Sequence, residues 1–148
     1  MRVTVNVRPK QTELDGMIKR LENLQPALEP AADALVKLVD DSFLNAQTPW
    51  GDAWKPLAES TIRRKGSSRP LVDSGVLKNS ITAKAEKLRI LLGTNVPYAG
   101  FHQFGTPNIP KREFLPVKDG EFPTEGPAGR TLALIKKYIL SYIRTGKP

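Results

Sequence analysis

The stretch Ile81-Thr82-Ala83-Lys84-Ala85-Glu86-Lys87-Leu88-Arg89-Ile90-Leu91-Leu92 decides the fold class. Its first half alternates apolar and polar residues, which is the period of a strand with one buried face, and an apolar run follows at once. We therefore expect a β-hairpin with its turn near Glu86-Lys87. A small, mainly antiparallel sheet in a chain otherwise dominated by helical spacing predicts an α+β fold.

Helical spacing precedes this hairpin. Apolar residues recur every three or four positions from Met17 to Val39, and prolines interrupt the pattern. Because proline lacks the amide hydrogen that a helix interior needs, we expect two helices, at about 11–24 and about 30–46, with Pro30 in a first turn.

Several further elements are expected along the chain. A C-terminal helix should carry the apolar stripe from Leu132 to Ile143, and Asp73 or Ser74 should cap a short helix. The other expected elements are a strand at 2–7, short helices at about 58–65 and 75–80, and a helical turn at 97–104.

Length and composition narrow the function classes. The 148 residues suit a single domain, 1–148. The chain has no cysteine and one histidine, which excludes disulfides, thiol nucleophiles, cysteine zinc sites and any scheme with two imidazoles. No phosphate-binding glycine motif or nucleophile elbow is present, so we expect no enzyme and no cofactor or metal. No apolar run approaches the length of a membrane span or a signal peptide, so neither membrane association nor secretion is expected.

A basic cluster accompanies a formal net charge of +8. Such a balance favours an anionic partner, either a nucleic acid or an acidic protein face. No aromatic stacking platform interleaves the cluster, which weakens a sequence-specific role, but a basic nucleic-acid-binding module remains the alternative function. The cluster consists of Arg63, Arg64, Lys65 and Arg69.

An irregular segment at about 103–129, rich in proline and glycine, predicts an arm-like loop. Its aromatic residues could anchor the loop on the core of the same chain, or be buried against a neighbouring subunit. Because a proline-rich loop has few internal hydrogen bonds, we expect the segment to become ordered only on assembly. The candidate interface residues, including the preceding helical turn, are Tyr98, Phe101, Phe104, Ile109, Arg112, Phe114 and Phe122.

Four blocks of sequence resemble the phage virion morphogenesis family, the tail-completion proteins of Mu-like and related contractile-tailed phages. The first is Phe43 followed by Thr48-Pro49-Trp50-Gly51-Asp52-Ala53-Trp54-Lys55-Pro56-Leu57. Leu71-Val72-Asp73-Ser74-Gly75-Val76-Leu77 and its continuation to Ile81 form the second, and residues 92–105 the third. The fourth is Ile109-Pro110-Lys111-Arg112-Glu113-Phe114-Leu115-Pro116.

The resemblance implies a non-catalytic structural protein of tail completion or of the head–tail junction, assembled as a ring of identical subunits. Its implied partners are copies of itself and the head-completion, connector, tail-tube or tail-terminator proteins, with non-specific contact to packaged DNA. It would occupy the neck or tail end of the virion, and the host cytoplasm during assembly.

The motif residues also have expected structural roles. Trp54 and Leu57 should pin the long loop to the helix that bears Phe43. Gly75 and Gly93 should lie where the backbone turns sharply or approaches a neighbour closely. The full set of structural motif residues is Phe43, Trp54, Leu57, Asp73, Gly75, Leu77 and Gly93.

Overall fold

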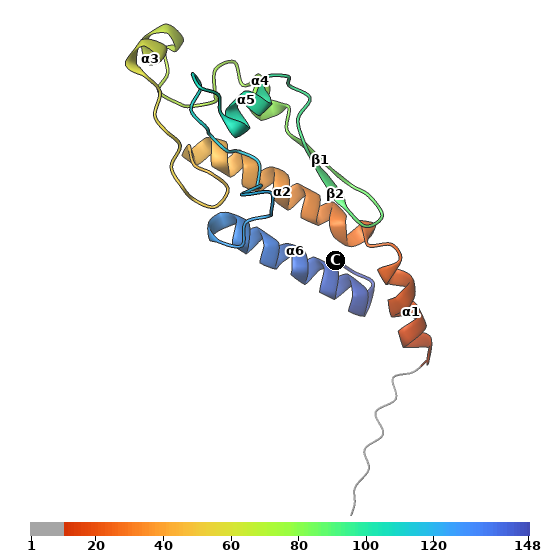
Figure 1. Cartoon of the computed structure of the whole chain (residues 1–148). Helices are drawn as coiled ribbons and strands as arrows, with labels where there is room; N and C mark the ends of the chain where they lie inside the picture. Colours follow the sequence, from red (N-terminus) through yellow and green to blue (C-terminus); the bar gives the residue numbers. More distant parts are fainter. Residues whose placement is uncertain (1–10) are drawn as a thin grey trace, which may run out of the picture.

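The computed structural model describes residues 11–148, which form an α+β arrangement of helices around one two-stranded antiparallel sheet (Figure 1). The strand expected at residues 2–7 lies outside the described residues. In chain order the elements are α1 (Gln11–Leu21), α2 (Gln25–Asn45), α3 (Glu59–Lys65), α4 (Val76–Asn79), β1 (Thr82–Ala85), β2 (Ile90–Gly93), α5 (Ala99–Phe104) and α6 (Gly126–Thr145).

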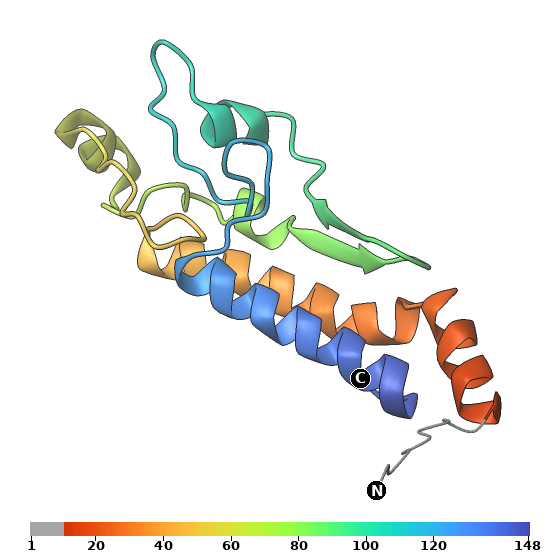
Figure 2. The same ribbon diagram turned by 60° about the horizontal axis from the view of Figure 1, so that its bottom comes forward.

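Helix α2 is the central element. It lies between α6 on one side and the β1–β2 hairpin on the other (Figures 1 and 2). A helix covered on two sides needs more than one apolar stripe, and α2 has it. Its buried residues are Ala27, Leu28, Ala31, Ala32, Leu35, Leu38, Val39, Ser42 and Phe43.

The start of α2 corrects the sequence prediction. The helix begins at Gln25 rather than near residue 30, with Pro26 in its first turn and Pro30 inside it. Pro26 is tolerated because the first amides of a helix have no partner within it. Pro30 deprives the helix of one hydrogen bond, and the buried face that includes Ala27, Leu28 and Ala31 continues past it.

The hairpin forms where the sequence predicts it. Ala83 pairs with Leu92 and Ala85 with Ile90, and these four side chains share the less exposed face of the sheet. The connecting loop includes the expected turn near Glu86-Lys87. The Lys87 carbonyl accepts a hydrogen bond of 2.9 Å from the Leu24 amide, and this bond joins the hairpin tip to the start of α2.

Helix α6 is fixed at both ends. Near its start, the Ala128 amide donates to the Pro49 carbonyl at 2.8 Å. Gly126 has a φ of +58°, and a Cβ there would lie 2.0 Å from the Trp50 carbonyl oxygen, so only glycine fits. At its C-terminal end, the Arg20 guanidinium donates from Nε to the Ile143 carbonyl at 2.8 Å, which satisfies a free helix-terminal carbonyl.

The core brings residues from all four sequence blocks together. Phe43 packs edge-on against Trp54, with ring centroids 5.6 Å apart, and lies 5.5 Å from the ring centroid of Phe114. The Trp54 indole donates to the Glu113 carbonyl at 2.8 Å, so the buried ring has a polar partner. The complete cluster is Val39, Phe43, Trp54, Leu77, Ile81, Ala99 and Phe114.

Candidate functional site

Helix α5 carries an exposed aromatic ridge. Tyr98 precedes the helix and is 42% exposed, while Phe101 is 54% and Phe104 74% exposed. Buried Ala99 and Gln103 attach the opposite face of the helix to the core. Residues three apart in a helix are neighbours, so the three exposed rings follow one another around α5, and large aromatic groups of this kind are typical interface anchors.

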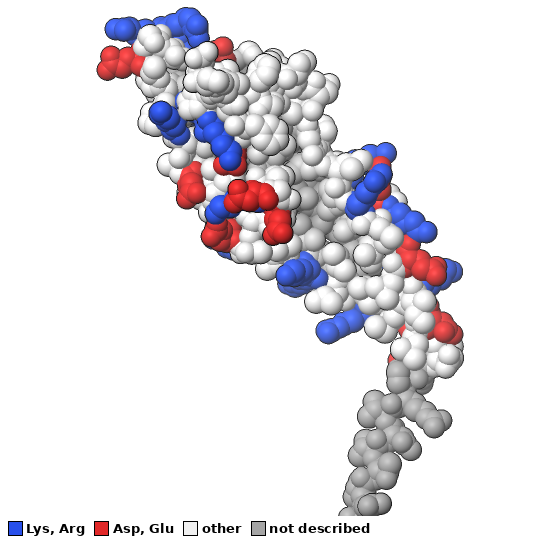
Figure 3. Space-filling view, in the orientation of Figure 1, with Lys and Arg blue, Asp and Glu red and all other residues white. Residues whose placement is uncertain are grey.

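The basic cluster projects from α3, at one end of the molecule. Arg63, Arg64 and Arg69 are exposed, and within residues 11–148 none of them takes part in an ion pair. Lys65 donates to the Arg69 carbonyl and is partly buried. Figure 3 shows Lys and Arg gathered at the end of the molecule where α3 lies.

A cavity of about 440 Å³ lies where these two features meet. Burial is the larger of two causes that lower the pKa of His102, and the charge of Arg112 is the other. Burial also lowers the pKa of Lys65, while nearby Asp73 opposes that shift. The lining residues are Leu57, Arg64, Lys65, Leu71, Asp73, Ser74, Gly75, Val76, Leu77, Tyr98 and His102.

The structure corrects the interface prediction for Phe114 and Arg112. Phe114 is fully buried in the core of its own chain. Arg112 is 5% exposed, and its guanidinium donates to the carbonyls of Lys55 at 2.8 Å and Pro56 at 3.1 Å. Both side chains are therefore internal anchors and are not accessible to a neighbouring subunit.

Gln103 explains why this part of the irregular segment is held in place. Its side-chain oxygen accepts hydrogen bonds of 3.0 Å from the amides of Phe114 and Leu115. These bonds replace the backbone partners that a proline-rich segment lacks. They attach residues 114 and 115 to α5, and the expectation that the segment becomes ordered only on assembly stays a prediction. Ile109 and Phe122 are partly buried, so their interface role stays a prediction.

The motif residues other than glycine occupy different environments. Phe43, Trp54 and Leu77 lie in the core, and Leu57 lines the cavity. Asp73 is exposed and caps no helix.

The two motif glycines differ in their environments. Gly75 precedes α4 with a φ of +81°, as a sharp turn requires, and neither Asp73 nor Ser74 provides the expected side-chain cap. Gly93 has neither a positive φ nor a close neighbour, so the expectation of a constrained backbone there is wrong.

Sequence reasoning missed Gln103 and Gly126. Gln103 is a polar residue among the aromatic residues of α5, which could have indicated a buried hydrogen-bonding role. No local signal marks Gly126, because the atom that excludes a side chain there belongs to Trp50, far away in sequence.

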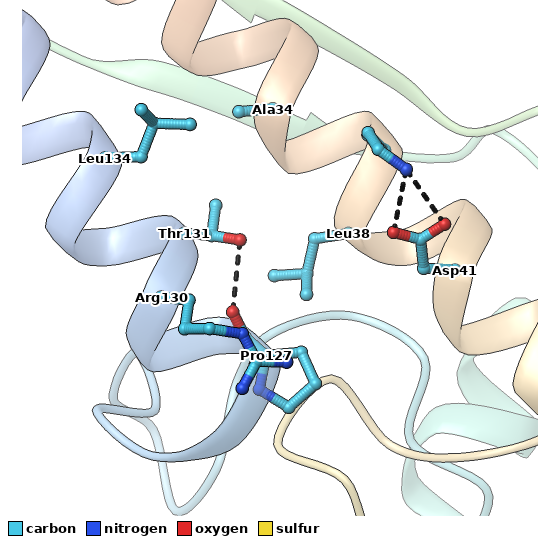
Figure 4. Close-up of a pocket in the computed structure, with 8 residues that line it drawn as sticks. Ala34, Leu38, Asp41, Pro127, Arg130, Thr131 and Leu134 are labelled. Atoms are coloured by element: carbon cyan, nitrogen blue, oxygen red, sulfur yellow. Dashed lines mark hydrogen bonds and ion pairs between the residues drawn. The ribbon is translucent and has the colours of Figure 1, made fainter.

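A second groove lies between α2 and α6 (Figure 4). Three of its polar side chains are engaged locally. Lys37 pairs with Asp41 at 3.0 Å, and the Thr131 hydroxyl donates to the Pro127 carbonyl at 3.2 Å. The labelled side chains in Figure 4 include no nucleophile aligned with a base, so this groove offers no catalytic arrangement.

Residues 11–148 contain neither a cluster of metal ligands nor a membrane-spanning helix. Within that range no group of three or more histidine, aspartate or glutamate side chains is arranged to hold a metal ion. Over the same residues, no helix combines the length and apolar character that crossing a bilayer requires.

The class of protein follows from the family that the chain matches. A rigid aromatic core that displays exposed aromatic and basic side chains is typical of proteins that bind other macromolecules. The phage virion morphogenesis family matches residues 5–131, and the chain belongs to this family. It is 31% identical to "Mu-like prophage FluMu G protein 2" of Haemophilus influenzae over 117 residues, which cover 74% of this chain and 78% of the relative. No solved structure matches it significantly. Family membership supports a role in phage structure and assembly.

Proposed function

We propose that this protein is a non-catalytic structural component of tail completion or of the head–tail junction, and that it acts as a ring of identical subunits. The observation that carries the proposal is the α5 ridge, in which three large aromatic groups stay exposed although the chain has a well-packed core. Exposed apolar groups gathered in one place mark interaction surfaces. Family membership supplies the context of virion assembly.

The proposed partners are further copies of this chain and the phage proteins next to it, which are head-completion or connector proteins on one side and tail-tube or terminator proteins on the other. The proposed location is the neck or tail end of the virion, after assembly in the host cytoplasm. Burying the exposed parts of Tyr98, Phe101 and Phe104 against such partners is favourable by about 25 cal/mol per Å² of apolar surface.

Deletion of the gene from its phage tests the proposal. We expect unjoined heads and tails, or tails of faulty length, in electron micrographs, with lysis of the host unaffected. Normal infectious particles from the deletion phage would contradict the assembly role.

Complementation of the deletion phage tests the ridge itself. The double variant Phe101→Ser and Phe104→Ser should fail to restore infectious particles. The matched control is Leu88→Ser, which changes a side chain of similar exposure on the hairpin loop, and it should restore them. Full complementation by the ridge variant would show that the exposed rings of α5 are not needed for assembly.

DNA contact is the second candidate, because Arg63 and Arg64 are exposed and unpaired within the described residues. As a non-specific contact it would weaken steeply with salt and show no sequence preference. Much tighter binding of one DNA sequence than of random duplex would instead identify a nucleic-acid-binding module.

A further inference from the structure

A tight acidic turn projects from the segment before α6. Lys118 and Glu121 exchange two backbone hydrogen bonds, of 2.9 and 3.0 Å, and both central residues have a positive φ, +52° at Asp119 and +87° at Gly120. Positive φ at both positions is the geometry of a type I′ turn, for which Asp-Gly is a preferred sequence. The acidic turn, residues 118–121, is therefore held in one conformation before any partner binds.

The charge of this turn is directed outward. Asp119 and Glu121 are exposed and form no ion pair within residues 11–148. Lys118 is engaged locally, because its ammonium group bonds Glu125 and lies 5.5 Å from the ring centroid of Trp50. Figure 3 shows Asp and Glu gathered where the 117–125 loop lies. On a chain of net charge +8, this is a distinct anionic patch.

The cavity between α3 and α5 has complementary chemistry. Arg64, Lys65 and His102 contribute nitrogen donors or positive charge, and Tyr98 contributes an aromatic wall. Its volume of about 440 Å³ lies within the range of pockets that enclose a ligand. Asp73, its acidic residue, lies near Lys65, so Arg64 in the lining, with exposed Arg63 beside it in sequence, remains available to a second group of carboxylates.

We propose that the acidic turn of one copy of this chain docks into the cavity between α3 and α5 of the next copy. The proposal rests on the proposed ring function and names the contact that would build the ring. Such a contact is heterologous, because each subunit contributes a different surface. Heterologous contacts close into rings or continue as filaments, whereas two-fold contacts stop at dimers.

A second copy of this chain fits the cavity better than an unrelated partner for a physical reason. The two surfaces have opposite charge and come from one sequence, yet no described hydrogen bond or ion pair joins them within the subunit. Pairing them across subunits offsets part of the repulsion expected between molecules of net positive charge.

The test uses two variants of the full chain, each defective on one surface. Arg63→Glu with Arg64→Glu reverses the basic side, and Asp119→Asn with Glu121→Lys removes the acidic side. Asparagine is chosen at Asp119 because it tolerates a positive φ, so the turn survives. All four positions are exposed, and circular dichroism will verify that both variants fold.

Sedimentation velocity at rising concentration gives the result. The unmodified chain should form species larger than a dimer at low salt. Each variant alone should associate at least about tenfold more weakly. An equimolar mixture of the two variants should form dimers and nothing larger, because only one competent contact exists between them. Arg64→Glu combined with Glu121→Lys in one chain should recover part of the association.

Other outcomes overturn the contact. The contact is wrong if the wild-type chain stays monomeric or if the variants assemble like wild type. It is also wrong if association depends on the basic side alone, which would indicate DNA or another acidic protein as the partner. Complementation separates this failure from failure of the function. If the acidic-turn variant restores infectious particles where the empty deletion phage gives none, the contact is wrong and the assembly role stands.

Discussion

At the residue scale, Phe114 shows how one buried residue fixes the irregular loop after α5 to the rest of the fold. Its ring packs against Phe43 of α2, and its amide bonds the side chain of Gln103 on α5. Next to it, Trp54 donates to the Glu113 carbonyl. The long loop after α5 is thereby attached to both the central helix and the loop around Trp54.

Truncation of a core phenylalanine should destabilise the fold strongly, whereas truncation of a ridge phenylalanine should hardly change its stability. Phe114→Ala should lower the free energy of unfolding by about 3–5 kcal/mol, because it leaves a cavity in the aromatic core. Phe101→Ala, the matched control on the exposed ridge, should change it by about 0.5 kcal/mol or less. Urea unfolding of both variants measures this, and equal losses would contradict the division between core and ridge.

His102 should make stability depend on pH. Burial and the nearby charge of Arg112 lower its pKa below 6.5, so the folded state keeps a neutral ring while the unfolded state takes up a proton. The contribution of His102 to the free energy of unfolding should therefore be fully present above pH 6.5. It should be lost as the pH falls from 6.5 toward the lower pKa of the folded state. Since His102 is the single histidine, His102→Gln should flatten this slope between about pH 7 and pH 5.5. Unfolding curves at both pH values test this, and identical slopes would contradict it.

At the element scale, α1 is a weakly supported helix whose packing partner is α6. It buries no residue, and Leu14, Ile18 and Leu21 are exposed. Its described polar attachment is Arg20, which bonds the carbonyls at the end of α6. A helix of 11 residues is marginal in water without such support.

Arg20→Ala should loosen α1 and the last turn of α6 together. We expect a loss of about 1 kcal/mol, because a charged donor at a helix C-terminus is removed. Hydrogen exchange should accelerate in both segments, and the hairpin should be unaffected. Lys19→Ala, at an exposed neighbouring position, is the control and should exchange like the wild type. Unchanged protection of α1 in Arg20→Ala would show that other contacts hold it.

Element type followed from local pattern, but helix ends did not. Alternation located the hairpin, and the three-to-four spacing located α2 and α6, because both periods follow from backbone geometry. The start of α2 differs from the expectation because a buried face that includes Ala27, Leu28 and Ala31 runs on both sides of Pro30. At α4 the N-cap position is Gly75, in the left-handed region, and neither Asp73 nor Ser74 caps the helix.

At the scale of the whole molecule, two surface regions differ in charge, although acidic and basic side chains are mixed along the hairpin. Basic side chains gather at α3, and carboxylates gather where the 117–125 loop lies (Figure 3). Exposed charges of this kind contribute little to folding, but they steer association. Surface charge should therefore affect assembly more than stability.

Changing Arg63, Arg64, Lys65 and Arg69 to serine tests this separation. The melting temperature should stay within about 4 °C of wild type, because these side chains are mostly exposed. Yield of infectious particles should fall. The matched control changes four exposed basic residues of α6 to serine, namely Arg130, Lys136, Lys137 and Arg144, and should leave the yield unchanged. Equal defects would mean that net charge, and not the α3 cluster, is what matters.

The sequence by itself determined the α+β class, the hairpin, the main helices and the family, because these depend on local periodicity and on blocks of neighbouring residues. Only the tertiary structure decided which aromatic residues are internal. Phe104 and Phe114 occur in the same irregular stretch, yet one is 74% exposed and the other fully buried. The difference arises because Gln103 and Trp54 bond the backbone at residues 113–115 and draw Phe114 onto Phe43. Contacts between residues so distant in sequence leave no periodic pattern, since burial depends on what the rest of the chain places opposite each side chain.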